Sequence, residues 1–197
     1  MTSTITALSS QIFLQVKKVG ITSLLLGLLL TPHTLTAAES TSIALENEIK
    51  AVYIYNFIRF TEWPDDTFSP AQSRELSILG NLSLLKTLKR DTFRKTAKDT
   101  SLDIHACQTP ACLEKSHVLF IDSSQSRKLT KIITSLKNRP ILTISDIPGF
   151  ADKGGMIEMK KEKERVVFIV NLKAAFKAKL YISAQLLQLA ELVETQP

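Results

Sequence analysis

One stretch, Pro140–Asn171, constrains the fold of this chain more than any other. Its first apolar run, Ile141–Ile144, is short and rich in β-branched residues and follows a proline, which is the pattern of a buried strand that starts after a turn. Two further strands are expected at Met156–Lys160 and Arg165–Val170, with a solvated turn at Lys161–Glu164 between them. Because the last of these runs is apolar without alternation, we expect a central strand that is covered on both faces by helices.

The loop after the first of these strands contains Ser-Asp-Ile-Pro-Gly-Phe. Asp146 follows a strand end, where α/β sheets often place functional groups, but an aspartate before Ile-Pro-Gly is also a common turn former. Phe150 can anchor a partner or lie in the core, and the sequence favours neither alternative.

The N-terminal segment has the pattern of a secretory signal peptide. Lys17 and Lys18 precede the apolar run Ile21–Leu30, and small residues follow up to Ala38. The run is too short to span a bilayer, which requires roughly 20 residues. We therefore expect residues 1–38 to be removed and residues 39–197 to form one exported, soluble domain.

The charge balance says little about partners. The chain has 25 basic and 19 acidic residues, and the excess of basic residues is modest and scattered. No basic stripe interleaved with aromatic residues indicates a nucleic-acid surface, so we expect no nucleic-acid partner.

Along the chain, expected strands alternate with expected helices. The order predicts a single-domain α/β three-layer sandwich with a mostly parallel sheet and an antiparallel C-terminal hairpin. The first helix is expected over Ser42–Phe60, ending near Trp63-Pro64, with Glu46 and Lys50 paired on its outer face. Its inward face is predicted from apolar residues at helical spacing, namely Leu45, Ile49, Val52, Tyr53, Phe57 and Phe60.

The two cysteines, Cys107 and Cys112, are separated by four residues. In an oxidising compartment two nearby cysteines usually form a disulfide, which here would stiffen a local turn. Free thiols, or a metal or redox pair, are the alternatives, although the spacing is not that of a C-x-x-C motif and no second pair is present to complete a zinc site.

The search for catalytic motifs is negative: the sequence has no G-x-S-x-G, P-loop, G-x-G-x-x-G or H-E-x-x-H pattern. His105 and His117 lie on expected strands and are interpreted as structural residues. We therefore expect no enzyme activity, no catalytic residue, no metal and no cofactor.

Binding is better supported than catalysis. Arg59, Glu62 and Trp63 crowd the end of the first helix, with Tyr55 one turn before Arg59. An arginine with aromatic neighbours is typical of a protein contact or an anion contact. The alternative is a tryptophan packed under the following loop beside a solvated arginine.

Several motifs, in the same order, resemble the YfiR-like family across nearly all of residues 39–197. The strongest are a helix with Tyr-Asn-Phe that runs into Glu-Trp-Pro and a loop that contains Ile-Pro-Gly-Phe-Ala. The stretches that carry the resemblance are Ala51–Pro64, His117–Ile121, Leu142–Ala151, Gly154–Ile157, Asn171–Leu172, Ala174–Ala175 and Leu180–Leu187.

The resemblance implies a periplasmic regulator with an α/β sandwich fold. Such a protein represses an inner-membrane diguanylate cyclase by binding the periplasmic domain of the cyclase, and an outer-membrane lipoprotein can sequester it. Dimers are typical and no reaction is known for the family. From the two strongest motifs we expect one partner-binding surface formed by Tyr55, Arg59, Glu62, Trp63, Asp146 and Phe150.

The chain departs from the family in its cysteines. Members often have a cysteine immediately before the His-Val-Leu-Phe-Ile strand, and this chain has Ser116 there. Redox control of the kind proposed for some relatives is therefore not expected by analogy.

Two other functions remain open. A small-ligand-binding protein that serves a different sensor or transporter would use the same loop cluster as a pocket. A hydrolase would use Asp146 and His117, although both residues have ready structural explanations.

Overall fold

The computed structural model describes residues 35–67, 73–90, 102–108, 110–163 and 165–193. The chain divides into two compact units, Met1–Thr41 and Ser42–Pro197. Most of the expected signal peptide, residues 1–34, lies outside the described residues. No helix within the described ranges is long and apolar enough to cross a membrane.

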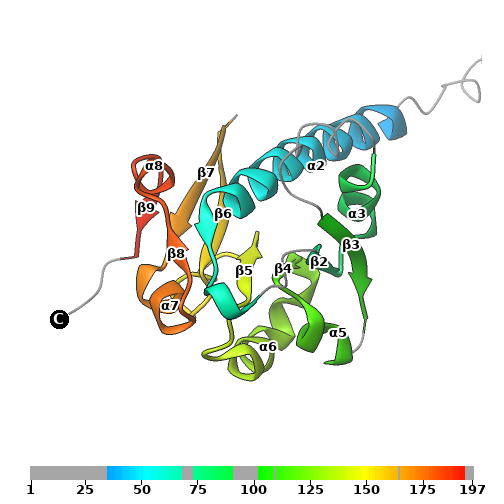
Figure 1. Ribbon diagram of the computed structural model, residues 1–197. Helices are drawn as coiled ribbons and strands as arrows, with labels where there is room; N and C mark the ends of the chain where they lie inside the picture. The colour runs from blue at the N-terminus through cyan, green and yellow to red at the C-terminus, as the bar shows by residue number, and fades with distance from the viewer. Residues whose placement is uncertain (1–34, 68–72, 91–101, 109, 164, 194–197) are drawn as a thin grey trace, which may run out of the picture. The chain divides into compact units, whose positions relative to one another are not determined.

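The unit from Ser42 onward is built around a seven-stranded sheet (Figure 1). The strand order is β3-β2-β4-β5-β6-β7-β9, and the first five strands of that order are parallel. β6 and β7 form the expected antiparallel hairpin. The predicted α/β sandwich with a mostly parallel sheet is therefore confirmed. The bounds are Arg74–Leu79 (β2), Leu102–Cys107 (β3), Val118–Ile121 (β4), Leu142–Ser145 (β5), Ile157–Glu162 (β6), Arg165–Val170 (β7) and Glu191–Leu192 (β9).

Helices cover both faces of this sheet (Figure 1). Helices α2 (Leu35–Arg59) and α3 (Leu82–Leu88) pack on one face in the larger core cluster. Helices α5 (Pro110–Lys115) and α6 (Leu129–Leu136) pack on the other face in a second cluster. Between β4 and α6 the 3-10 helix η2 (Ser123–Lys128) is capped by Asp122, whose carboxylate accepts from the Ser124 amide.

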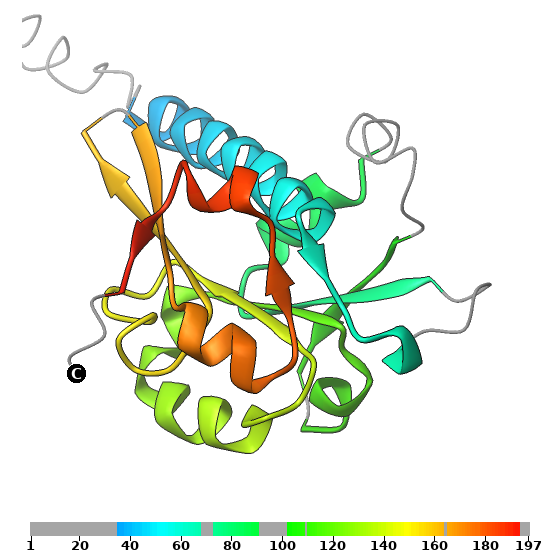
Figure 2. The ribbon, with the colours of Figure 1, turned by 60° about the vertical axis from the view of Figure 1, so that its left-hand side comes forward.

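The C-terminal part returns to the end of α2. After α7 (Leu172–Lys177) the short strand β8 (Tyr181–Ile182) pairs antiparallel with β1 (Thr61–Glu62), as Figure 2 shows, and α8 (Ala184–Leu187) follows. The side chains of Asn171 and Ser183 cap α7 and α8. A further 3-10 turn, η1, covers Asp65–Thr67.

The expected central strand at Arg165–Val170 has the right bounds but the wrong environment. β7 pairs along its whole length with β6, but β9 pairs only with Ile169 and Val170. The part of β7 before Ile169 therefore lies at the edge of the sheet. Val166 and Val167 in this part are half-buried rather than covered on both faces. The apolar run reflects contacts with α2, where the Tyr53 hydroxyl donates to the Val166 carbonyl (3.0 Å).

The predicted inward face of α2 is also partly wrong. Phe57 is fully buried as expected, but Leu45 is 59% exposed and Val52 is 50% exposed. The face that packs on the sheet is rotated so that it carries Lys50 inward. Its buried residues are Asn47, Lys50, Ala51, Ile54, Phe57 and Ile58.

The loop after β5 is held tightly rather than displayed. The buried Glu158 carboxylate accepts from the backbone amides of Gly149 (3.0 Å) and Ala151 (3.1 Å). Phe150 is fully buried in the second core cluster, and a Cβ atom added at Gly155 would lie 2.1 Å from its ring. Gly155 thus makes room for this ring.

Gly155→Ala should destabilise the fold strongly, because the added methyl group would force Phe150 out of its place. Overpacking of this kind costs about 1–3 kcal/mol. Lys153→Ala, an exposed change in the same loop, is the matched control and should leave the urea unfolding midpoint nearly unchanged. Equal midpoints for the two variants would contradict the packing of Phe150 against Gly155.

Candidate functional site

Arg59 and Glu62 lie at the end of α2, where the chain turns into β1. Both side chains are exposed. In the β1–β8 pair Glu62 lies directly opposite Tyr181, whose side chain is 57% exposed. An arginine, a carboxylate and an aromatic ring are thus presented together, which is the composition of a protein contact.

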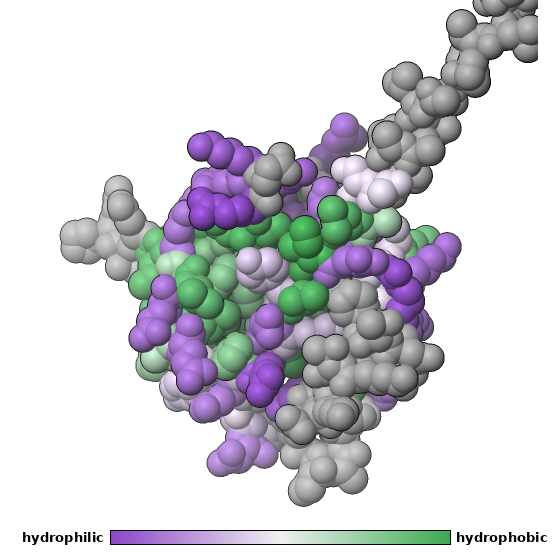
Figure 3. All heavy atoms as spheres, turned by 90° about the horizontal axis from the view of Figure 1, so that it is seen from above, coloured by the Kyte–Doolittle hydropathy of each residue, from purple (hydrophilic) through white to green (hydrophobic). Residues whose placement is uncertain are grey.

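The exposed side of α2 extends this surface along the helix. Leu45, Val52 and Arg59 are spaced seven residues apart, so a helix with 3.6 residues per turn places them in one line. Figure 3, which views the molecule from the side of α2, shows apolar side chains gathered on that face. We call Leu45, Val52, Arg59, Glu62 and Tyr181 the α2 surface.

Tyr55 and Trp63, which we expected in the contact surface, are bound to the protein itself. The Tyr55 hydroxyl donates to the Leu88 carbonyl (3.2 Å). Trp63 is 8% exposed, and its indole N–H donates to the Pro140 carbonyl (3.1 Å). The Arg74 guanidinium lies over the Trp63 ring, 5.0 Å from its centroid. Both residues therefore position the end of α2 more than they face a partner.

Asp146, at the carboxyl end of β5, forms a buried ion pair with Lys50. Lys50 Nζ lies 2.7 Å from Asp146 Oδ2 and 2.6 Å from Glu46 Oε1. The predicted Glu46–Lys50 pair is therefore present, but Lys50 points into the molecule. Asp146 Oδ1 is buried and has no hydrogen-bond partner among the described residues.

The charges of this triad stabilise one another. Burial would lower the pKa of Lys50, but the hydrogen bonds and attraction of Asp146 and Glu46 outweigh burial and raise that pKa above its ordinary value. The hydrogen bond from Lys50 lowers the pKa of Glu46. The Glu46 contribution to stability is thus present above its unfolded pKa and is lost as the pH falls through its lowered folded pKa.

The six residues of the expected partner-binding surface are not brought together on one exposed face. Arg59 and Glu62 are exposed and adjacent. Asp146 pairs with Lys50, which lies roughly 13 Å from Arg59 along the axis of α2. Phe150 lies in the core cluster of the opposite face of the sheet. We therefore keep Arg59 and Glu62 in the candidate surface and treat the other four as residues that support it from inside.

Tyr181, Leu45 and Val52 belong to the candidate surface but were missed by the sequence reasoning. The last two were assigned to the core because their spacing is that of a buried stripe. A helix cannot bury both Lys50 and the opposite apolar line, and no local signal chooses between them, because the choice rests on the distant partner Asp146. Tyr181 had no local signal, because only the β1–β8 pairing brings it beside Glu62.

The geometry does not assemble the hydrolase that the sequence left open. His117 precedes β4 and Asp146 follows β5, which are parallel strands with Val118 opposite Leu142. The two side chains therefore start about five residues apart along the strands, roughly 16 Å. The imidazole of His117 accepts from the Glu75 amide (2.9 Å), and burial lowers its pKa. Among the described residues no group of three or more His, Cys, Asp or Glu side chains is placed to hold a metal ion.

Comparison with known proteins assigns the chain to a family. The description YfiR/HmsC-like matches residues 47–191, which is well over half of the chain. The protein belongs to the YfiR/HmsC-like family. No curated protein matches the sequence.

A solved structure shares the fold of this YfiR/HmsC-like protein at low sequence identity. A conserved domain protein from Vibrio cholerae O1 biovar El Tor matches with a TM-score of 0.52 and 9% identity, over 75% of this chain and 60% of that one. The chain thus spans less than two thirds of that relative. An ABC domain in complex with L-Trp from Streptococcus pneumoniae matches with a TM-score of 0.47 and 12% identity, over 61% and 56% of the two chains.

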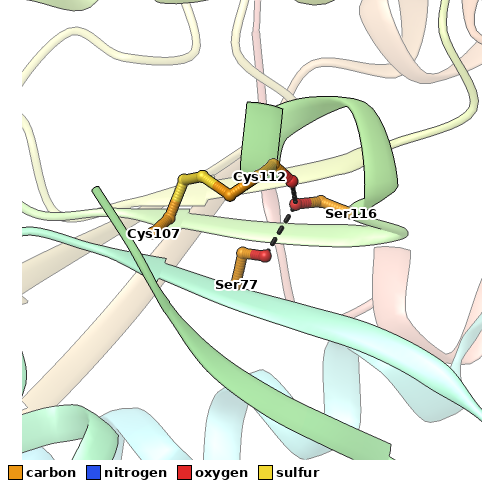
Figure 4. The surroundings of a disulfide bond; sticks show 4 residues. All are labelled: Ser77, Cys107, Cys112 and Ser116. Carbon is orange, nitrogen blue, oxygen red and sulfur yellow. Dashed lines mark hydrogen bonds between the residues drawn. A yellow bond between two sulfur atoms is a disulfide. The ribbon is translucent and has the colours of Figure 1, made fainter. Parts of the chain in front are cut away.

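This family member carries a disulfide, as expected, between Cys107 and Cys112 (Figure 4). The bond joins the carboxyl end of β3 to α5, with the two Cα atoms 5.6 Å apart. Ser116 is buried, and its Oγ lies 2.7 Å from both Ser77 Oγ and the Cys112 carbonyl oxygen. Ser116 is thus held inside the protein by hydrogen bonds, directly before the segment that leads into β4.

Lys50→Met should lower the free energy of unfolding by about 3–5 kcal/mol, because it leaves the Asp146 carboxylate buried without a counter-charge. Lys50→Met combined with Asp146→Leu should lose clearly less than the sum of the single changes. Urea unfolding measures both.

Lys160→Met is the matched control, since it breaks the exposed Lys160–Glu162 pair (2.6 Å) and should leave the midpoint unchanged. Additive losses in the Lys50/Asp146 double variant would show that the two charges do not interact.

Proposed function

We propose that this protein is a periplasmic regulator that represses an inner-membrane diguanylate cyclase by binding the periplasmic domain of the cyclase. Membership of the YfiR/HmsC-like family supports the regulatory role. The Cys107–Cys112 disulfide supports an oxidising compartment such as the periplasm, because disulfides persist there and are rare in the cytosol.

The observation that carries the proposal is the composition of the α2 surface. Leu45, Val52 and Tyr181 are each at least half exposed, and Arg59 and Glu62 stand beside them. Aromatic residues and arginine are enriched among the side chains that dominate binding energy, whereas aliphatic neighbours exclude water around them. A protein partner covers such a surface better than a small ligand does.

The mechanism needs only differential affinity. If the α2 surface binds the inactive state of the cyclase more tightly than the active state, binding shifts the population toward the inactive state. A lipoprotein of the outer membrane that occupies the regulator would lower its free concentration and release the cyclase. A homodimer would present two such surfaces at once.

Arg59→Glu should abolish repression, because it replaces the cation at the end of the α2 surface with a carboxylate beside Glu62. In a strain that lacks the gene, cyclic di-GMP should rise, and the wild-type gene should restore the low level while the variant fails. Loss of a dominant contact of this type costs 2 kcal/mol or more, which is about 30-fold in affinity.

Lys137→Glu makes the same charge change at an exposed position at the end of α6, on the opposite face of the sheet, and should repress as the wild type does. Immunoblots of the periplasmic fraction check that the variants are present in equal amounts, and circular dichroism of the purified variants checks that they are folded. Full repression by Arg59→Glu would overturn the assignment of the α2 surface. No change in cyclic di-GMP on deletion would overturn the cyclase as partner.

A further inference from the structure

The strand order creates a topological switch point between β2 and β4. From β2 the chain crosses to β3 on one side, and from β4 it crosses to β5 on the other side. In open α/β sheets, ligands bind in the crevice outside the carboxyl ends of the strands at such a point. In this chain those carboxyl ends are Leu79 and Ile121.

A cleft of about 610 Å³ lies beside this point, at the carboxyl ends of β2 and β3, and no β4 residue is among its described lining residues. Its walls come from the carboxyl ends of β2 and β3, from Leu82 at the start of α3, from α5, and from η2 and α6. The floor is apolar, with Ile78, Leu79, Ala106, Leu113 and Ile132. The volume is within the range of about 300–1,000 Å³ of small-molecule sites.

Two local features hold the walls of the cleft in place. Gly80 has φ +102°, and a Cβ atom there would lie 2.7 Å from Ser124 Oγ, so β2 and η2 approach each other more closely than another residue would allow. The Cys107–Cys112 disulfide ties the end of β3 to α5, which carries Leu113. The cleft is therefore formed before any ligand binds.

The charge of the cleft has one sign. Among its described lining residues, the charged side chains are Lys128 and Lys131, three residues apart on the same helical face. Both are exposed, and neither forms an ion pair with a described residue. Gln108, Gln125 and Ser135 add neutral polar groups.

We propose that this cleft binds a small organic anion with an apolar body and one carboxylate, sulfonate or phosphate group. The apolar body lies on the floor formed by β2, β3 and α6, and the anionic group is held at the rim by Lys128 and Lys131. The site is separate from the α2 surface, so the proposal does not depend on the cyclase as partner.

The experiment uses residues 39–197 with the disulfide oxidised. The fluorescent probe 1-anilinonaphthalene-8-sulfonate serves as the ligand. The double variant Lys128→Gln/Lys131→Gln should weaken binding of the probe at least about tenfold, because it removes the charged partners of the sulfonate. Lys137→Gln, which removes a neighbouring exposed lysine outside the cleft, should leave the affinity unchanged.

Ser135→Phe is a second variant, which adds bulk to the cleft from an exposed position of α6. It should abolish the same binding with an unchanged thermal midpoint. The carboxylate 4-phenylbutyrate should displace the probe, and the neutral 4-phenylbutanamide should not. Amide NMR shifts caused by 4-phenylbutyrate should centre on Gly80, Cys107 and Leu113.

Three results would overturn the proposal. Probe binding that is unchanged in both cleft variants would place the probe elsewhere, for example on the α2 surface. Equal competition by the neutral amide would exclude an anion site. Amide shifts confined to α2 would show that the cleft is not the site. None of these results bears on the repression assay of Arg59→Glu.

Discussion

The buried ion pair between Lys50 and Asp146 decides how the first helix lies on the sheet. A charged side chain is buried only when a partner stabilises it, so Lys50 must face the carboxyl end of β5. Leu45, Val52 and Arg59 are five residues before, two after and nine after Lys50. At about 100° per residue, all three fall on the opposite side of the helix. The exposure of Leu45, Val52 and Arg59 thus follows from the orientation that the Lys50–Asp146 pair shares with the buried apolar residues Ala51, Ile54, Phe57 and Ile58.

A second carboxylate acts on the loop that is most distinctive in the sequence. Glu158 binds two backbone amides of the Gly149–Ala151 turn, and Phe150 fills the core beneath it. The Ile-Pro-Gly-Phe-Ala motif of this loop thus has a structural role in the fold. Asn171 also binds this loop, because its side-chain amide donates to the Ala151 carbonyl (2.7 Å). Glu158 and Asn171 thus satisfy backbone groups of the loop that would otherwise lie buried without partners.

The two candidate sites use different parts of the architecture. The α2 surface is a convex line of side chains on a helix, which suits a protein partner. The cleft is concave and lies at the carboxyl ends of the parallel strands β2 and β3, which suits a small molecule. A regulator with both features could couple a ligand to a partner only if the two sites favour the same conformational state.

The sequence by itself determined the elements and the class of fold. Apolar runs bounded by proline and glycine located β5, β6 and β7. The short spacing of the two cysteines likewise favoured their pairing. These inferences succeeded because each depends on local chemistry.

Only the tertiary structure decided which faces are exposed. Asp146 is 96 residues from Lys50 in sequence, so no helical periodicity could indicate that Lys50 turns inward and Val52 outward. Tyr181 joins Glu62 only through the β1–β8 pairing, and the cleft exists only because β4 returns beside β2. The residues of both candidate sites are thus set by long-range contacts, which sequence patterns of short range do not encode.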